Sequence, residues 1–275
     1  MPLLADPPAR LHLSVDDVVT VLRDLAERPL ATPWAQPTLG WLRELHEASG
    51  AVVSLYPFLR DGGWRLERMP ARHRDAFEAA SGWLRFGFHA LDAASDYGIG
   101  GLPAAVAGAH YGRFVTAVRR FAGAAAIDRA PRVHRFLGTA RAVRAWRDAP
   151  DGVVGLLTAD DARADVYHLD GETRARLARD GVAFDARERI WLVASLPRLE
   201  RLAAVAERLD AAVAAGWTRR GVPLCLFTHE VHLGDPRVRA RVGRALAWAR
   251  SAGAAFAFPQ DVWPPAQPDA SDSTS

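Results

Sequence analysis

The chain has 275 residues, 49% of them hydrophobic, and a formal net charge of +3 at pH 7. This length and apolar content suffice for one compact domain, which we expect over residues 1–263. All 35 basic residues are arginines, and they alternate with acidic residues along stretches such as RLERLAAVAERLD, a pattern that argues against nucleic-acid binding.

Cysteine content and hydropathy exclude further classes. The single cysteine, Cys225, lies in an apolar run, so the chain has neither a disulfide framework nor a cysteine-based metal site. No stretch approaches the roughly 18 apolar residues that span a bilayer, and the N-terminus lacks the pattern of an export signal. We therefore expect a cytoplasmic protein without membrane insertion. Residues 264–275 are rich in Pro, Ser and Asp and predict a disordered tail.

Short apolar runs alternate with longer amphipathic segments along the chain. The expected strands cover residues 11–15, 51–58, 84–89, 132–136, 153–159, 190–195, 223–231 and 255–259. The expected helices cover residues 36–48, 71–82, 103–123, 139–147, 197–215 and 236–252, the fifth with Ser195 as a possible cap. Seven or eight mostly parallel strands separated by helices predict an α/β fold, a closed or nearly closed (β/α) barrel. An open, doubly wound sheet is the alternative.

Two segments interrupt this alternation. Residues 59–73 and 160–189 contain Asp-Gly turns that are typical of hairpins, and we expect both to extend from the strand ends. Loops at that end are where barrels place their chemistry.

Polar residues follow several of the expected strands. They are Asp16, Asp17, His89, Asp92, His134, Asp160, His229 and Glu230. The carboxyl ends of parallel strands meet at one mouth, so these side chains are predicted to converge. Each also has a purely structural interpretation: an Asp pair after a strand commonly caps the next helix, and a lone His at a strand end is commonly a hydrogen-bonded core residue.

Two adjacent carboxylates raise each other's proton affinity and are costly to bury, and a bound cation would relieve both effects. Zn²⁺ accepts His and Asp ligands and lowers the pKa of a bound water toward about 7. Asp17 could therefore bind a divalent metal, with zinc the best candidate, while Asp16 accepts a proton from the water. His229 has the chemistry of a general acid.

Three short motifs resemble those of the NodB-type polysaccharide deacetylases. SVDDV at 14–18 is similar to the first motif of that family, FGFH at 86–89 to the strand that leads to its metal-binding histidines, and LFTH at 226–229 to its last motif. The likeness extends over about 11–260. It implies metal-assisted hydrolysis of an N- or O-acetyl group on a carbohydrate, with Asp16 as base, Asp17 and His89 as metal ligands and His229 as acid.

The sequence departs from the family pattern at two places. The second family motif has two His four residues apart, but Ala93 occupies the second position. His110 is the preferred third ligand, because His is the usual ligand type, with Asp92 and His134 as alternatives. The Arg-Pro-Tyr motif is also absent, and Arg132 or Arg135 could replace its arginine.

The remaining polar residues of the mouth are assigned to the carbohydrate substrate. They are Asp92, His134, Arg135, Asp160 and Glu230.

Two other functions remain open from the sequence. The first is a catalytically inert carbohydrate-binding barrel, which the incomplete His pair favours. The second is a glycoside hydrolase without metal, in which Asp17 would work with Asp160 or Glu230 as paired carboxylates.

Overall fold

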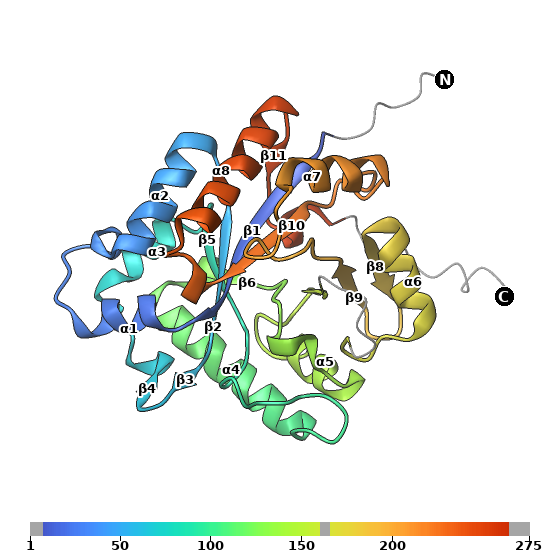
Figure 1. Cartoon of the computed structure of the whole chain (residues 1–275). Helices are drawn as coiled ribbons and strands as arrows, with labels where there is room; N and C mark the ends of the chain where they lie inside the picture. Colours follow the sequence, from blue (N-terminus) through green and yellow to red (C-terminus); the bar gives the residue numbers. More distant parts are fainter. Residues whose placement is uncertain (1–7, 160–165, 264–275) are drawn as a thin grey trace.

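The computed structural model describes residues 8–159 and 166–263, and a mostly parallel sheet lies at its centre (Figure 1). The strand order of this six-stranded sheet is β10 (Leu224–His229), β1 (Arg10–Val18), β2 (Val53–Pro57), β5 (Leu84–Gly87) and β6 (Ile127–Asp128), with β11 (Ala255–Phe256) beside the start of β1. Every pair is parallel. All five residues of β2 are buried, as expected for a central strand covered on both faces.

A second sheet contains three strands. It contains β7 (Gly155–Leu157), β9 (Ile190–Val193) and β8 (Val182–Asp185), with β8 antiparallel to β9. Individual backbone contacts connect its strands to the neighbouring segments: the amide of Leu157 donates to the carbonyl of Pro131, just after β6, and Ser195, just after β9, forms an isolated parallel bridge with Cys225 of β10. A mostly parallel α/β fold is therefore confirmed, but among the described residues these strands lie in two separate sheets and not in one closed barrel.

Helices surround these strands (Figure 1). They are α1 (Thr20–Glu27), α2 (Pro37–Ser49), α3 (Arg74–Ala79), α4 (Ala104–Phe121), α5 (Ala140–Arg147), α6 (Gly171–Asp180), α7 (Val205–Ala214), α8 (Pro236–Ser251) and α9 (Pro259–Val262). Six short 3₁₀ turns connect them: η1 (Pro33–Ala35), η2 (Leu66–Arg68), η3 (Ala71–His73), η4 (Ala124–Ala126), η5 (His134–Phe136) and η6 (Glu230–His232). No helix of the described ranges is long and apolar enough to cross a membrane.

Local sequence signals set the ends of α2. Pro37 occupies its first turn, and the side-chain oxygen of Gln36 accepts hydrogen bonds from two amides there. At the other end Gly50 adopts a left-handed conformation with φ 74°, which glycine reaches without steric cost. Leu39 and Leu42 point into the core, so the apolar face packs on the sheet.

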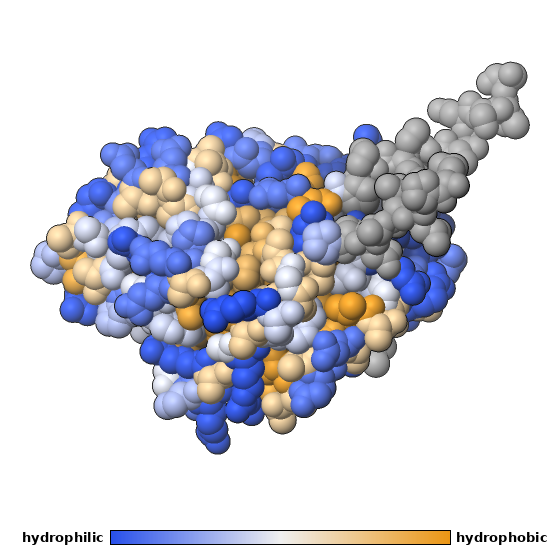
Figure 2. Space-filling view, turned by 90° about the horizontal axis from the view of Figure 1, so that it is seen from above, coloured by the Kyte–Doolittle hydropathy of each residue, from blue (hydrophilic) through white to orange (hydrophobic). Residues whose placement is uncertain are grey.

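Hydrophobic side chains from both sheets and the surrounding helices form one main core. Phe88 lies in its aromatic part, in contact with Phe114 of α4 and with Trp146 of α5. Figure 2 shows hydrophilic residues around the rim of one face, with hydrophobic residues nearer its middle.

Three sequence predictions of local structure were wrong. Residues 132–136 form no strand, because Arg135 and Phe136 have φ values of 56° and 61° that an extended strand does not allow, and the short strand β6 precedes them. The helix expected over 197–215 begins only at Val205, since the preceding segment hydrogen-bonds along β10 through the amide of Leu199 and the carbonyl of Phe227.

The third error is the helix α6, which was not expected in the segment 160–189; the hairpin expected there is present, because β8 pairs antiparallel with β9. The hairpin in 59–73 is confirmed: β3 (Arg60–Asp61) pairs antiparallel with β4 (Trp64–Arg65). The expected tail at 264–275 and Asp160 lie outside the described residues.

Candidate functional site: a carboxylate and two imidazoles

The site begins at an irregularity near the end of β1. The pairing of β1 with β2 shifts its register between Val15 and Val18, and Asp17 has a left-handed φ of 59°. Asp adopts this conformation more readily than most residues, but it still indicates local strain. As a result Asp16 is buried whereas Asp17, its neighbour, is only half-buried.

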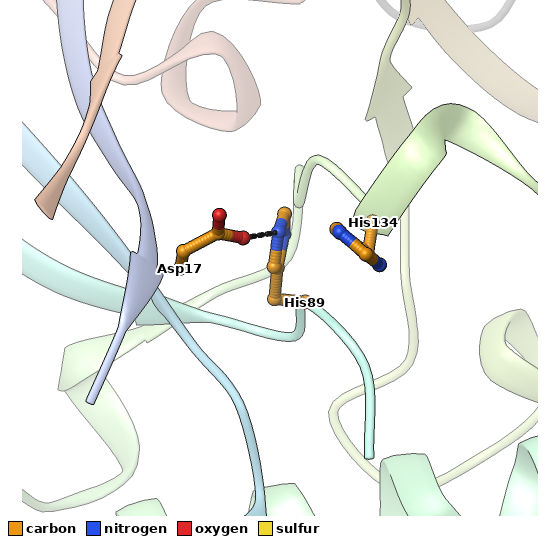
Figure 3. A group of neighbouring side chains, drawn as sticks. All are labelled: Asp17, His89 and His134. Carbon is orange, nitrogen blue, oxygen red and sulfur yellow. Dashed lines mark hydrogen bonds and ion pairs between the residues drawn. The ribbon is translucent and has the colours of Figure 1, made fainter. Parts of the chain in front are cut away.

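His89 lies two residues after β5 and connects two parts of the site. Its Nδ1 lies 2.6 Å from the carbonyl oxygen of Arg132, and because a carbonyl only accepts, this nitrogen carries a proton. Its Nε2 lies 3.0 Å from Oδ1 of Asp17 (Figure 3). In the neutral imidazole Nε2 would present a lone pair to the carboxylate, so this contact requires a proton or another cation between the two atoms.

The carboxyl group of Asp17 is held ionised by this contact. Burial, the largest influence, favours the neutral acid, but the hydrogen bond and the positive charge of His89 together outweigh it and keep the pKa of Asp17 below its ordinary value. The site therefore presents a full negative charge beside two imidazoles.

His134 is the third member of this group. Its backbone amide donates to the carbonyl of His89 at 2.9 Å, and its ring packs on those of His89 and Phe58. Burial, with the charge of His89, lowers the pKa of His134 to about 4, so this imidazole is neutral at pH 7. Its buried Nδ1 has no hydrogen-bond partner in the described part of the chain.

One ligand atom from each of Asp17, His89 and His134 lies within 4.8 Å of the others (Figure 3). Two imidazole nitrogens and one carboxylate oxygen match the ligand types of catalytic zinc sites, which use three protein ligands and leave a position for water. The carboxylate of Asp17 faces the imidazole of His89, and the imidazole of His134 has a buried nitrogen without a hydrogen-bond partner in the described residues. These donor atoms therefore fit a divalent cation.

Asp16 faces a buried arginine on the other side of the strand end. Its Oδ1 accepts a hydrogen bond from Nη1 of Arg132 at 2.8 Å. The same guanidinium donates to the hydroxyls of Ser14 and Ser195 and stacks 4.0 Å over the ring of Phe227. The Asp16 carboxylate is therefore paired and fixed in one orientation.

His229 ends β10 directly opposite Asp16 in the strand register. Its Nδ1 lies 2.5 Å from Oε1 of Glu200, whose other oxygen accepts from the hydroxyl of Thr228. Burial opposes its protonation most strongly, but the Glu200 hydrogen bond and the charges of Asp16, Glu200 and Asp17 together raise the pKa of His229 above its usual value. This imidazole is therefore poised to donate a proton.

A small pocket brings these groups together. Its volume is about 150 Å³, and Asp16, His89, Arg132, His134 and His229 line it. Val133, Arg135, Phe136, Arg198 and Phe227 complete the wall. Asp16, His229 and the imidazoles of His89 and His134 thus line one pocket.

Several residues predicted for the site lie elsewhere. His110 is buried on α4 and contacts the Tyr97 hydroxyl at 3.1 Å, so the structure places His134, and not His110, beside Asp17 and His89. Asp92 pairs with Arg60 and accepts from the hydroxyl of Ser95.

Glu230 has a structural role. Its two carboxylate oxygens accept hydrogen bonds from the amides of Val19, Thr20 and Val21 at the start of α1. Glu230, and neither Asp16 nor Asp17, therefore supplies the cap of the helix that follows β1.

Two residues of the site were missed from the sequence. Glu200 fits the polar face of the helix expected over 197–215, and only the pairing of that segment with β10 brings it to His229. Tyr167 lies in the segment that was expected to be a loop, and no local pattern marks its contact with the pocket wall.

Comparisons with known proteins leave the family open. No protein-family model and no curated protein matches the chain. One solved structure that it resembles is described as "Family 4 carbohydrate esterase from Streptomyces lividans in complex with acetate", with 12% sequence identity, a TM-score of 0.42 and coverage of 94% of this chain and 97% of that one. A likeness this distant establishes no activity, so the function of this chain has to be argued from its own residues.

Proposed function

We propose that the protein is a metal-dependent hydrolase that removes an N- or O-acetyl group from a carbohydrate. The observation that carries the proposal is the convergence of Asp17, His89 and His134, whose ligand atoms lie within 4.8 Å of one another beside a pocket lined by Asp16 and His229. Such a set of ligands, base and acid around one space is what metal-assisted acyl hydrolysis requires.

Asp17, His89 and His134 would hold the cation, with zinc the best match to two nitrogens and one oxygen. When bound, a divalent cation would supply a Lewis acid for the acyl oxygen and a water whose pKa is lowered to about 7. The hydrogen bond from His89 Nδ1 to the carbonyl of Arg132 fixes the tautomer that offers Nε2 as a ligand.

Asp16 is the proposed general base. Its carboxylate lines the pocket, and the hydrogen bond from Arg132 keeps it oriented. It would accept the proton from the attacking water. Arg132 also donates hydrogen bonds to Ser14 and Ser195, so the side chain that orients Asp16 is itself held in place.

His229 is the proposed general acid. The tetrahedral intermediate collapses only when its amine or alkoxide leaves, and protonation of that group lowers the barrier. Glu200 holds Nδ1 of His229 and favours its protonated form, so the imidazolium can donate to the leaving group.

Two features support a small acyl group on a carbohydrate. A volume of about 150 Å³ equals about five water molecules, which leaves room for an acetyl group and the attacking water. The similarity of SVDDV, FGFH and LFTH to the deacetylase motifs indicates the carbohydrate. Arg135 and Phe136 line the same pocket and are proposed to contact the sugar.

The other functions gain no support from these contacts. In a glycoside hydrolase Glu230 would have to face the pocket with a free carboxylate, but both of its oxygens accept amides of α1. Asp160 lies outside the described residues. An inert binding barrel would not need Asp16 paired with Arg132 or His229 paired with Glu200 beside the same pocket.

The proposal is tested by acetate release from N-acetylated and O-acetylated oligosaccharides. We expect activity that is lost after dialysis against a chelator and restored by Zn²⁺ or another divalent ion. Acetate release that is unaffected by metal removal would contradict the metal-dependent mechanism, and no release from either substrate type by the metal-loaded protein would contradict the deacetylase function.

A further inference from the structure

A strained segment carries His134. Residues 132–136 form one wall of the pocket, and within it Arg135 and Phe136 are consecutive non-glycine residues with left-handed φ values of 56° and 61°. Each such residue costs about 1–3 kcal/mol and persists only where surrounding contacts enforce it. The hydrogen bond from the His134 amide to the carbonyl of His89 is one such contact, but it holds only the residue that precedes Arg135 and Phe136 in the sequence.

Tyr167 supplies contacts on both sides of that pair. Its backbone amide donates to the carbonyl of Phe136 at 2.6 Å, and its hydroxyl accepts from the amide of Val133 at 3.1 Å. The same hydroxyl donates to the carbonyl of Leu157, at the end of β7, at 2.9 Å. Tyr167 thus holds both ends of the segment 133–136: its backbone amide binds Phe136, and its hydroxyl links Val133 to the strand β7.

The ring of Tyr167 is placed by close packing. A Cβ at Gly138 would lie 3.2 Å from Cδ1 of Tyr167 and 3.0 Å from the ring of Trp146, so the absent side chain leaves room for both rings. Burial raises the pKa of the Tyr167 hydroxyl, which therefore stays protonated and can donate and accept at the same time.

We infer that Tyr167 is a positioning residue for the metal site: it holds the segment 133–136 in the conformation that turns His134 toward Asp17 and His89. This inference rests on the proposed function. A ligand loses affinity when its support is removed, and partners outside the ligand set typically contribute 10-fold to 100-fold to metal affinity. Tyr167 touches neither the cation nor the substrate in this account, and it acts only through His134.

The experiment is a zinc titration of the purified full chain and of Tyr167→Phe, in competition with a chromophoric chelator. The substitution keeps the ring and removes the hydroxyl. We expect the Kd for Zn²⁺ to rise about 10-fold, and the absorption spectrum of the Co²⁺-loaded protein to change because the ligand geometry changes.

Tyr111→Phe is the matched control. Tyr111 is a buried residue of α4, whereas Tyr167 is partly buried, and the Tyr111 hydroxyl donates to the carbonyl of Asp151, outside the pocket lining. Both variants lose a buried hydroxyl bound to backbone, so a similar fall in thermal stability is expected for both. Only Tyr167→Phe should change the Kd and the Co²⁺ spectrum.

A double-mutant cycle separates positioning from general loosening. In a His134→Ala background, Tyr167→Phe should leave the Kd unchanged within about twofold, because the ligand that it positions is absent. The inference is overturned if Tyr167→Phe alone binds Zn²⁺ as the unmodified chain does, or if its effect persists without His134. If the unmodified chain itself binds no Zn²⁺, the proposed metal-dependent function is wrong. If it binds Zn²⁺ and Tyr167→Phe binds equally well, only the inference about Tyr167 is wrong.

Discussion

The adjacent carboxylates of Asp16 and Asp17 would repel each other, and each is stabilised by a different partner. Asp16 is 2% exposed and is neutralised by Arg132, while Asp17 is turned by its left-handed backbone toward His89. The two carboxylates therefore face different partners. This division gives one carboxylate to proton transfer and the other to metal binding in the proposed mechanism.

At the same scale, Glu200 sets the charge of His229. Glu200→Gln removes the negative charge that favours the imidazolium, so the pKa of His229 should fall. A general acid works only while it is protonated, and its rate therefore declines as pH rises through that pKa. The alkaline limb of kcat/KM against pH should shift to lower pH in this variant.

Glu207→Gln is the control for that profile, since Glu207 is an exposed residue of α7. It should retain the alkaline limb of the unmodified enzyme. If Glu200→Gln shows the same limb as well, His229 is not the group that titrates there.

Removal of the acid itself has a larger effect. His229→Ala should reduce kcat by about 10²-fold to 10⁴-fold, because general acid catalysis typically contributes that much. Bound metal should be retained, since His229 is not among the three converging ligands. Loss of metal together with activity, measured by elemental analysis, would assign His229 to the metal site instead.

At the scale of secondary-structure elements, Glu230 links the end of β10 to the start of α1. Three helix amides that would otherwise lack partners donate to its carboxylate. A negative charge at a helix N-terminus is also favoured by the helix dipole. The contact fixes α1 directly after the strand that carries Asp16 and Asp17.

Glu230→Ala should therefore lower the free energy of unfolding by about 1–2 kcal/mol, the usual cost of a lost cap, in urea titrations. Zinc affinity should stay within about twofold. Glu47→Ala is the control: this exposed residue makes only a helix-surface pair with Arg43 and should cost under about 0.5 kcal/mol. Equal stability of the two variants would exclude a capping role.

Sequence periodicity was sufficient to predict most elements but not the irregular ones. The buried strands β1, β2 and β10 and the amphipathic helices α2, α4 and α8 lie close to their predicted ranges, because their apolar spacing reflects packing on both sides of a sheet. The run RVHRF has the composition of a strand. Its left-handed residues depend on contacts from Tyr167, which is distant in sequence, and so no local pattern could reveal them.

The candidate site shows the same limit. Asp16, Asp17, His89 and His229 lie at or just beyond the carboxyl ends of β1, β5 and β10, so topology alone predicts their proximity. Preference for His110 as third ligand relied on residue type, but α4 directs that side chain to Tyr97. The course of the chain after β6 decides which of His110, Asp92 and His134 lies beside Asp17 and His89, and no sequence pattern shows that course.

At the scale of the whole molecule, Arg132 joins the two sheets. It lies 1% exposed between Ser14 and Asp16 on β1 and Ser195 just after β9. A second series of buried side-chain hydrogen bonds lies in the interior, where His12 contacts Ser54 and Ser54 donates to Asp128. The contacts of Arg132 thus connect β1 with the residues just after β9, while those of Ser54 connect strands within the central sheet.

Arg132→Ala should consequently destabilise the fold by about 3–5 kcal/mol, because it leaves the Asp16 carboxylate buried without its partner. Urea unfolding measures this directly. Arg141→Ala changes an exposed arginine of α5 and should stay within about 0.5 kcal/mol of the unmodified chain. A cost below about 1 kcal/mol for Arg132→Ala would show that the pair does not support the interior.

The most direct test of the whole account is zinc titration of single-ligand variants. The unmodified chain should bind close to one equivalent of Zn²⁺. Asp17→Ala, His89→Ala and His134→Ala should each weaken binding at least about 100-fold, as expected when one of three protein ligands is lost, while His110→Ala binds as before. Absence of zinc binding by the unmodified chain, or loss of binding in His110→Ala but not in His134→Ala, would contradict the metal site proposed here.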